Sequence, residues 1–321
     1  MSRYDVFNGD ADGICGLHQL RLDQPIDDVI RVTGVKRDIQ LLERVPAQAG
    51  DAITVLDISL ASNRTAVDRL LAAGASIDYF DHHQSGSIPT HTGFRSHIDT
   101  SAAVCTSVLV DRHLHGRQRA WAVVGAFGDN LVAVAEQLAA TLGLDADQQA
   151  RLRALGECIN YNAYGESVGD LYFAPEALYQ RIAAYTDPFA FIAEEPVAQA
   201  LASGMRSDLD NALAVAPAMR TRAGDIVILP DAAWARRAHG TLANRLAEAA
   251  PSGAHAVLAP RSEGGFVVSV RAARVRPNGA GALCSEFDTG GGRNAAAGIN
   301  HLPNDALERF ERRFLEMLGQ Q

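Results

Sequence analysis

The first hundred residues alternate between short apolar runs and stretches in which apolar positions recur every three or four residues. The short runs predict β-strands at residues 4–7, 29–35, 51–56 and 76–80. The helical spacing predicts α-helices between them, at residues 14–22, 38–44 and 63–73. Strands that alternate with helices in this way predict a mostly parallel sheet with helices on both faces.

The pattern then becomes helical and later returns to strands. Further helices are expected at 102–115, 131–142, 146–161 and 175–185, and an apolar helix or strand at 120–127. Pro196 stands near the head of a connecting helix at 194–215. Strands at 225–230, 254–259 and 265–272, with a helix at 233–249, follow that helix. The predicted fold class is α/β, with an N-terminal domain at 1–193, a connecting helix or linker at 194–222 and a smaller C-terminal α/β domain at 223–321.

Polar side chains with metal-binding chemistry follow three of the predicted strands. They are Asp10 and Asp12 after the first, Asp57 after the third, and Asp81, His82 and His83 after the fourth. Ligands gather at the carboxyl ends of strands in parallel sheets, and carboxylate with imidazole suits Mn, Fe or Zn. The alternative for the first pair is an Asp/Gly turn with a helix N-cap. Asp129 is a fourth acid that follows an apolar run, so the whole set favours a divalent metal site.

Composition limits the partners of such a site. The chain has 321 residues, of which 47% are hydrophobic and 21% charged, and a net charge of −9. This charge disfavours an extended grip on duplex nucleic acid, whereas small anions or short single strands remain compatible because bound metals add positive charge. The four scattered cysteines indicate buried thiols in a reducing compartment. Without a signal peptide or a long apolar run, we expect a cytoplasmic protein with no membrane span.

Two later stretches have the chemistry of phosphate binding. Ser101 lies at the expected start of the helix at 102–115, whose N-terminal N–H groups suit an anion, although Thr100 or Ser101 as a plain N-cap explains the residues equally well. The glycine run Gly290, Gly291 and Gly292 permits close approach of a ligand, and Arg293 and Asn294 follow it. A glycine-rich turn is the alternative for this run.

Taken in order, these motifs resemble the DHH phosphoesterases over nearly the whole chain. The matching segments are residues 8–13, Asp57, residues 81–83, residues 128–130, and a glycine motif at 290–298 in a fitting second domain. The family includes exonucleases of the RecJ type, hydrolases of short oligoribonucleotides, cyclic-dinucleotide phosphodiesterases and pyrophosphatases of a related branch.

The resemblance implies two Mn²⁺ ions, with Mg²⁺ as the other candidate. Asp10 and Asp57 would hold one ion, and the second would be held by Asp12, Asp57, His82 and Asp129. Asp81 would orient the ligands, and the implied contacts to substrate come from His83, Asn8, Ser101, Gly290, Gly291, Gly292, Arg293 and Asn294. Three positions depart from the pattern: Val6 replaces a common His, Asn8 replaces the Asp of RecJ-like members, and Arg293 replaces a common His. The first two departures leave one metal position weaker or completed by water.

The implied activity is hydrolysis of single-stranded or short oligonucleotides to mononucleotides, with metal-activated water. A phosphodiesterase for cyclic or linear dinucleotides is the nearest alternative, and a pyrophosphate or polyphosphate hydrolase is a more distant one. An inactive nucleic-acid-binding accessory protein is the alternative from another class. Whether the chain works alone or as a homodimer stays open.

Overall fold

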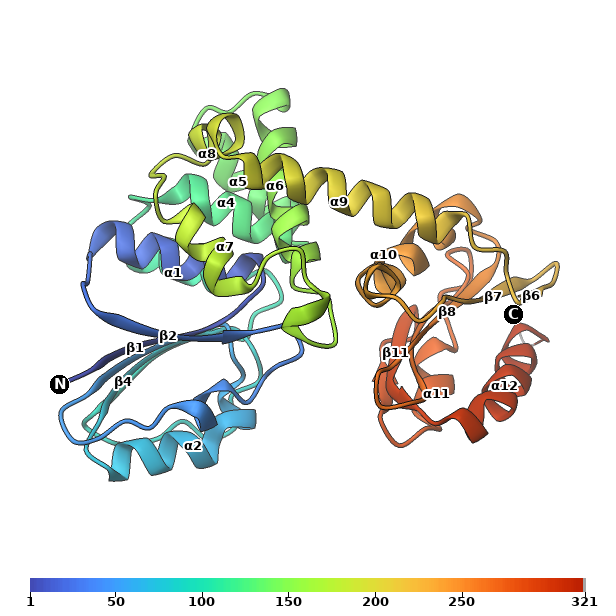
Figure 1. The fold of residues 1–321 in the computed structure, drawn as a ribbon, viewed down its shortest axis with the longest axis horizontal. Helices are drawn as coiled ribbons and strands as arrows, with labels where there is room; N and C mark the ends of the chain where they lie inside the picture. The colour runs from blue at the N-terminus through green and yellow to red at the C-terminus, as the bar shows by residue number, and fades with distance from the viewer. Residues whose placement is uncertain (320–321) are drawn as a thin grey trace. The chain divides into compact units, whose positions relative to one another are not determined.

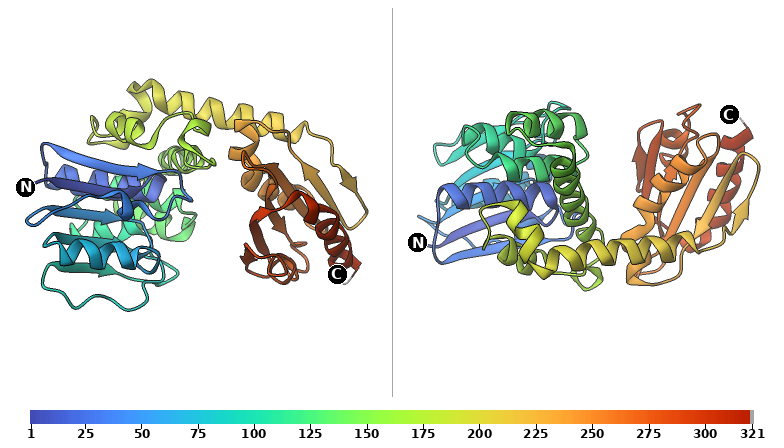
Figure 2. Two further views of the ribbon diagram at one scale, coloured as in Figure 1. Left: turned by 60° about the horizontal axis from the view of Figure 1, so that its bottom comes forward. Right: turned by 90° about the horizontal axis from the view of Figure 1, so that it is seen from above.

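The computed structural model describes residues 1–319. The chain divides into two compact units, Met1–Ser203 (unit 1) and Gly204–Gln321 (unit 2). Figure 1 shows the elements of both, and the turned views in Figure 2 follow the chain along the yellow helix α9 (Pro196–Leu213) from one unit to the other. The α/β class predicted from the sequence is confirmed. The finer division at residues 193 and 222 stays a prediction.

Unit 1 is built on a five-stranded sheet in which every pair of neighbours is parallel. Its strands are β1 (Arg3–Asn8), β2 (Val29–Gly34), β3 (Ala52–Leu56), β4 (Ser76–Asp81) and β5 (Phe94–Ile98), in the order β2-β1-β3-β4-β5. The four predicted strands are present, whereas β5 was not predicted. It is an edge strand with a polar sequence, and such a strand carries little of the apolar pattern that marks a central one.

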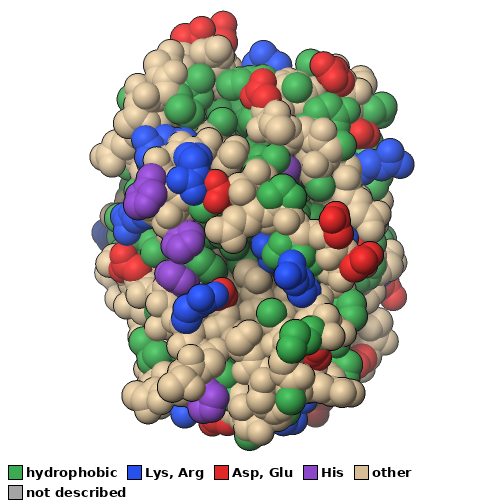
Figure 3. Space-filling view, turned by 90° about the vertical axis from the view of Figure 1, so that its left-hand side faces the viewer, with side chains coloured by type: hydrophobic (Ala, Val, Ile, Leu, Met, Phe, Trp, Pro, Cys, Tyr) green, Lys and Arg blue, Asp and Glu red, His purple; other side chains and the backbone are tan. Residues whose placement is uncertain are grey.

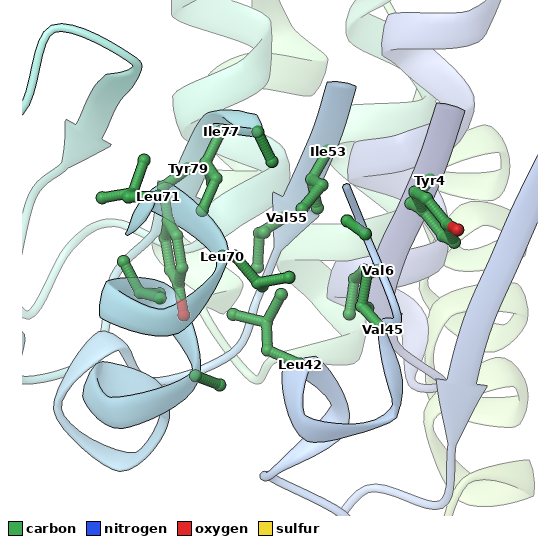
Figure 4. Packing of buried hydrophobic residues seen from close by; sticks show 14 of the residues in the cluster. Tyr4, Val6, Leu42, Val45, Ile53, Val55, Leu70, Leu71, Ile77 and Tyr79 are labelled. Atoms are coloured by element: carbon green, nitrogen blue, oxygen red, sulfur yellow. The ribbon is translucent and has the colours of Figure 1, made fainter. Parts of the chain in front are cut away.

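Helices cover both faces of this sheet. On one face lie α2 (Leu60–Ala72) and the 3₁₀ helix η1 (Leu41–Arg44), and on the other lie α1 (Ala11–Asp23), α3 (Thr106–His113) and α4 (Arg119–Gly128). Figure 4 shows the core under α2, where alternate residues of neighbouring strands meet its leucines. Val6 is fully buried in this apolar cluster, so the position where many DHH members carry His offers no ligand here.

Two predicted helices of unit 1 differ from the structure. The helix expected at 38–44 is reduced to η1, because Pro46 follows closely and prevents continuation. The helix expected at 102–115 begins only at Thr106, so neither Thr100 nor Ser101 is its cap; the N-cap is Cys105. The rest of unit 1 is helical, with α5 (Val132–Thr141), α6 (Ala146–Asn162), η2 (Val168–Asp170), α7 (Pro175–Ile182) and α8 (Pro188–Glu194).

Unit 2 has a six-stranded mixed sheet in the order β10-β11-β9-β8-β7-β6. Its elements are β6 (Met219–Arg220), β7 (Gly224–Ile228), α10 (Ala233–Ala249), β8 (Ala254–Pro260), β9 (Phe266–Arg271), α11 (Ala280–Cys284), β10 (Gly290–Gly292), β11 (Ala296–Leu302), η3 (Asn304–Ala306) and α12 (Leu307–Gly319). Successive residues such as Val257 and Leu258 point to opposite faces. Val257 packs with α10, and Leu258 packs with α11 and α12. The predicted smaller C-terminal α/β domain is therefore a sheet between two helical layers.

No helix within residues 1–319 is long and apolar enough to cross a membrane. On the face shown in Figure 3, acidic and basic side chains are interspersed and neither charge forms a broad patch. This face therefore has no extended basic track for duplex nucleic acid, which is consistent with the net charge of −9.

Candidate metal centre

The carboxyl ends of β1, β3 and β4 bring the predicted polar residues to one edge of the sheet. The strand order reverses direction at β1, which pairs with β2 on one side and with β3 on the other. Such a switch point leaves a crevice beyond the strand ends, because the connections from β1 and β3 leave toward opposite faces. Asp10 and Asp12 follow β1, Asp57 follows β3, and the Asp-His-His run ends β4.

Asp10 both caps a helix and faces the crevice. Its Oδ1 accepts hydrogen bonds from the backbone N–H groups of Asp12 at 3.0 Å and Gly13 at 3.1 Å, which makes it the N-cap of α1. The N-cap alternative from the sequence is thus realised for Asp10, and its second oxygen faces away from the cap.

Asp12 is held by a helix from a distant part of the chain. The N–H groups of Thr106 and Ser107, in the first turn of α3, donate to its two oxygens at 2.7 and 2.8 Å. The N-terminus of α3 therefore holds a carboxylate of the protein itself, and this contact explains why the helix starts later than predicted.

Asp57 has a backbone conformation that is rare for a residue with a side chain, with φ at 59°. Its N–H donates to the carbonyl of Phe80 at 3.0 Å, and Thr106 Oγ1 lies 3.4 Å from Asp57 Oδ1. A left-handed residue immediately after a buried strand turns the chain sharply, and strain of this kind persists where the surrounding structure enforces it. The turn presents the carboxylate between those of β1 and the imidazoles of β4.

The two histidines after β4 have different partners. His83 Nδ1 lies 2.7 Å from Oδ1 of the fully buried Asp81, while its side chain stays 45% exposed. The hydrogen bond to Asp81 raises the pKa of His83, so its protonated form is favoured. His82 Nε2 instead faces the carboxylates, at 3.5 Å from Asp57, 3.9 Å from Asp12 and 4.0 Å from Asp129.

Asp129 reaches this cluster from the C-cap of α4, and the chain turns away at Asn130, whose φ is 62°. All three aspartates of the predicted set, Asp12, Asp57 and Asp129, therefore lie within 4.0 Å of His82. Ligands about 2.1 Å from an octahedral ion lie about 3 Å apart when adjacent and about 4 Å apart when opposite. The separations from His82 Nε2, 3.5, 3.9 and 4.0 Å, exceed the distance between adjacent ligands by about 1 Å or less, so small side-chain movements would bring these donors onto one divalent cation.

The electrostatics of the cluster also call for a cation. Burial, together with the neighbouring Asp10 and Asp12, raises the pKa of Asp57 well above its ordinary value. Burial and the charge of Asp12 raise the pKa of Asp129 to about 7. Carboxylates that resist ionisation because they are crowded and buried recover their usual acidity when a divalent ion is bound among them.

Two residues at the site were not predicted from the sequence. Cys105 is one of them: its Sγ lies within 4.8 Å of ligand atoms of Asp12 and Asp129, so these three residues form a group that could hold a metal ion. Asp57, His82 and His83, all predicted, form another group of this kind. Lys36, just after β2, bonds Asp10 Oδ2 through its ammonium group. Its signal in the sequence is that Lys36 is the only lysine among the 29 lysines and arginines of the chain.

Among the predicted substrate contacts of unit 1, Asn8 and Ser101 have partners within the protein. Asn8 Nδ2 donates to the Lys36 carbonyl at 3.2 Å, and Asn8 Oδ1 accepts from the Asp10 N–H at 3.3 Å. Ser101 bonds Asp99 through both its N–H and its hydroxyl, in a turn ahead of α3. The predicted anion site at a helix start beside Ser101 is therefore wrong, since no helix begins there.

The predicted glycine motif lies in unit 2, and it forms a strand. Gly290, Gly291 and Gly292 make β10, which pairs antiparallel with β11. A Cβ at Gly290 would lie 1.8 Å from the Cys284 carbonyl, and Gly292 has a φ of 140°, so these two glycines are required by the fold. Gly291 has open space where a Cβ would be, and Arg293 and Asn294 are exposed beyond it. Their contact with substrate stays a prediction.

Comparison with known proteins finds likeness in structure. No protein-family model and no curated protein matches the sequence. Solved structures match along the whole chain. An exonuclease RecJ bound to manganese has a TM-score of 0.63 at 18% identity, covering 99% of this chain and 90% of the other. RecJ of Thermus thermophilus in complex with Mn²⁺ has a TM-score of 0.66 at 19% identity, covering 99% of this chain and 52% of the other. The pGpG-specific phosphodiesterase PggH of Vibrio cholerae has a TM-score of 0.55 at 17% identity, covering 100% and 99%.

The chain has the DHH phosphoesterase fold. Asp57, His82 and His83, whose ligand atoms lie within 4.8 Å of one another, follow the strand ends where the sequence motifs were recognised. The chain spans about half of the Thermus RecJ and nearly all of PggH, so the likeness to PggH extends over both chains in full.

Proposed function

We propose that this protein is a divalent-metal-dependent phosphodiesterase that hydrolyses short single-stranded oligonucleotides to mononucleotides. The observation that carries the proposal is the approach of three carboxylates, those of Asp12, Asp57 and Asp129, to within 4.0 Å of one imidazole nitrogen of His82. Four groups that favour a cation converge from separate elements on one point of a DHH fold.

The four residues fit Mn²⁺ or Mg²⁺, because Mn²⁺ accepts carboxylate with imidazole and Mg²⁺ prefers carboxylate with water. When bound, the metal supplies an activated water and stabilises charge on the phosphate oxygens. Relatives in solved structures carry Mn²⁺ or Mg²⁺.

His83 and Asp81 would then act on the substrate. Asp81 is fully buried and bonds Nδ1 of His83, which fixes the ring while the side chain stays 45% exposed. A protonated ring in this position can hold a phosphate oxygen or protonate the departing sugar oxygen. Asp81 is thus a positioning residue for His83.

The choice of a short substrate rests on charge. The net charge of −9 favours a substrate with few phosphates over a long polyanion. A dinucleotide phosphodiesterase is a second candidate, which the full-length match to a pGpG-specific enzyme favours.

The test is Mn²⁺-dependent hydrolysis of end-labelled RNA and DNA from two to about twenty nucleotides, with a cyclic dinucleotide alongside. A ladder from one end of the longer strands would support the oligonucleotide reaction and show its polarity. Turnover confined to dinucleotides would establish the second candidate. Tight metal-dependent binding without turnover of any of them would instead indicate an accessory binding protein.

Asp57→Asn provides the loss-of-function variant, and Asp68→Asn on α2 provides its matched control. Asp68 is exposed and pairs with Arg64 on the surface of the helix. Only the first substitution should remove turnover. Equal rates in both variants would contradict the assignment of the site.

A further inference from the structure

We propose that the ammonium group of Lys36 serves as a built-in cation on the Asp10 side of the cluster, so that the centre binds one divalent ion, on the His82 side. This rests on the proposed metal-dependent function. It differs from the pair of ions expected from the family resemblance.

The Lys36 ammonium occupies a pocket of oxygen atoms. It bonds Asp10 Oδ2, lies 3.1 Å from Asn160 Oδ1 and is 3.9 Å from Asp129 Oδ1. The ring of Tyr164 lies beside it, with its centroid 5.9 Å from Nζ. Oxygen ligands of this kind, supplied by two carboxylates and an amide, are those that a hard divalent cation would otherwise use.

The backbone holds Lys36 in this place from both sides. Its N–H donates to the carbonyl of Ala163 at 3.0 Å, and its own carbonyl accepts from Asn8 Nδ2 at 3.2 Å. An Asp at position 8 has no N–H to donate, so Asn8 suits a chain that fixes Lys36 here. The departure of Asn8 from the RecJ-like pattern and the presence of Lys36 therefore belong to one arrangement.

The composition of the chain singles out this position. Every other basic residue among the 29 is arginine, including those that form ion pairs elsewhere in the protein. Guanidinium is a wide planar fork, whereas ammonium is a compact charge that donates in three directions. The single lysine thus stands at a position where a small, nearly spherical cation fits between oxygens.

The charge of their partners separates the two aspartates that follow β1. Asp10 Oδ1 accepts two backbone N–H groups, and Oδ2 accepts the Lys36 ammonium. Asp12 accepts one backbone N–H on each oxygen and bonds no ammonium. An ion on the outer oxygen of Asp10 would therefore lie beside the positive charge of Lys36 and be repelled by it, whereas an ion on Asp12 would not bind next to a bonded ammonium.

The first test uses the single lysine as a spectroscopic probe. Protein labelled with ¹⁵N and ¹³C in lysine, without a lysine-containing tag, gives one lysine side-chain signal in NMR. We expect saturation with Mg²⁺ to leave the Lys36 ammonium signal protected from exchange with water. A signal that moves to the position of an exposed lysine and exchanges rapidly would overturn the proposal.

The second test counts bound ions by equilibrium dialysis with metal analysis, and examines the Mn²⁺ by electron paramagnetic resonance. We expect one ion per chain in the wild type, with the spectrum of an isolated Mn²⁺. Lys36→Met should raise the count to two and give the spectrum of an interacting pair.

Two aspartate variants serve as matched controls for this count. Asp10→Asn keeps the N-cap oxygen and should leave the count at one, whereas Asp12→Asn should reduce it to zero. If Lys36→Met does not fold, the wild type and the aspartate variants still decide. Two ions in the wild type, falling to one in Asp10→Asn, would overturn this inference and leave the proposed function intact. Absence of any bound ion in the wild type would instead contradict the proposed function.

Discussion

The two sides of the carboxylate cluster compensate buried charge in different ways. On the Asp10 side, the ammonium of Lys36 outweighs the effect of burial and lowers the pKa of Asp10. On the His82 side, burial and neighbouring carboxylates raise the pKa of Asp57 and Asp129. The chain itself compensates the charge on the first side, whereas the second side is where we propose that a cation from solution binds.

This contrast teaches that a group of acids at a strand end is not uniform in function. Burial costs each carboxylate a large part of its hydration, and a partner must offset that cost. Where the partner is part of the chain, the acid stabilises the fold. Where the charge offered by the chain does not outweigh burial, the acid destabilises the metal-free protein, and the proposed metal would supply the missing positive charge.

The largest expected effect follows from removing a carboxylate of the metal-dependent side. Asp57→Asn should lower the rate of hydrolysis by on the order of 10³-fold or more, because Asp57 lies between the ligands of both neighbouring strands. The metal-free variant should be at least as stable as the wild type, since a crowded charge is removed and Asn accepts the positive φ of 59°. Wild-type turnover in this variant, measured beside Asp68→Asn, would remove the site.

The next effect is a pH dependence that has opposite signs on the two sides. Asp129 has a pKa of about 7 in the folded protein, above its ordinary 3.8, so it stabilises the fold below pH 4 and that contribution is lost as the pH rises to about 7. Without metal, Asp129→Asn should therefore gain stability relative to the wild type over this interval, by on the order of 3 kcal/mol.

The comparison variant is Asp10→Asn. The pKa of Asp10 is lowered in the folded protein, so its contribution is present above its ordinary value and is lost as the pH falls. Urea unfolding between about pH 4 and 7 should show Asp129→Asn gaining stability relative to the wild type as the pH rises. Asp10→Asn should be less stable than the wild type by a constant amount over that interval, and this deficit should shrink only below the ordinary pKa of 3.8. If both variants changed the free energy of unfolding in the same direction, the distinction between the two sides would be wrong.

A smaller effect is expected when Lys36 loses its charge. Lys36→Met should destabilise metal-free unit 1 by about 2–3 kcal/mol, because Asp10, only 2% exposed, is left without its charged partner. Mn²⁺ should restore more stability to this variant than to the wild type. The unfolding of unit 1 is followed by the fluorescence of Trp121 in a Trp234→Phe background, since Trp234 belongs to unit 2. Equal stabilisation of both proteins by Mn²⁺ would contradict the pairing.

The smallest effect concerns the residue that fixes Lys36. Asn8→Asp removes the donor to the Lys36 carbonyl and adds a buried charge, which should cost about 1–2 kcal/mol. Asn294→Asp, at an exposed position of unit 2, is the matched control and should stay within about 0.5 kcal/mol of the wild type. Thermal unfolding followed by calorimetry, which records both units, measures both. An Asn8→Asp variant as stable as the wild type would show that the chain around Lys36 does not depend on this bond.

Much of unit 1 was predictable because its central strands are buried and its helices amphipathic. The strand ends at Asp10, Asp57 and Asp81 were located from apolar runs that stop at polar residues. The edge strand β5 and the late start of α3 were missed. A polar edge strand has little periodicity, and the start of α3 depends on the contact of Thr106 with Asp12, 94 residues earlier in the chain.

The sequence by itself determined the α/β class, the order of the strands along the chain and the supply of acids and imidazoles at strand ends, because these follow from local periodicity and residue chemistry. The tertiary structure decided which of them meet. His82 reaches the carboxylates while His83 is held by Asp81, and Lys36 is carried to Asp10 from the end of the neighbouring strand. Contacts between residues distant in sequence depend on strand order and side-chain packing, and neither leaves a local pattern in the chain.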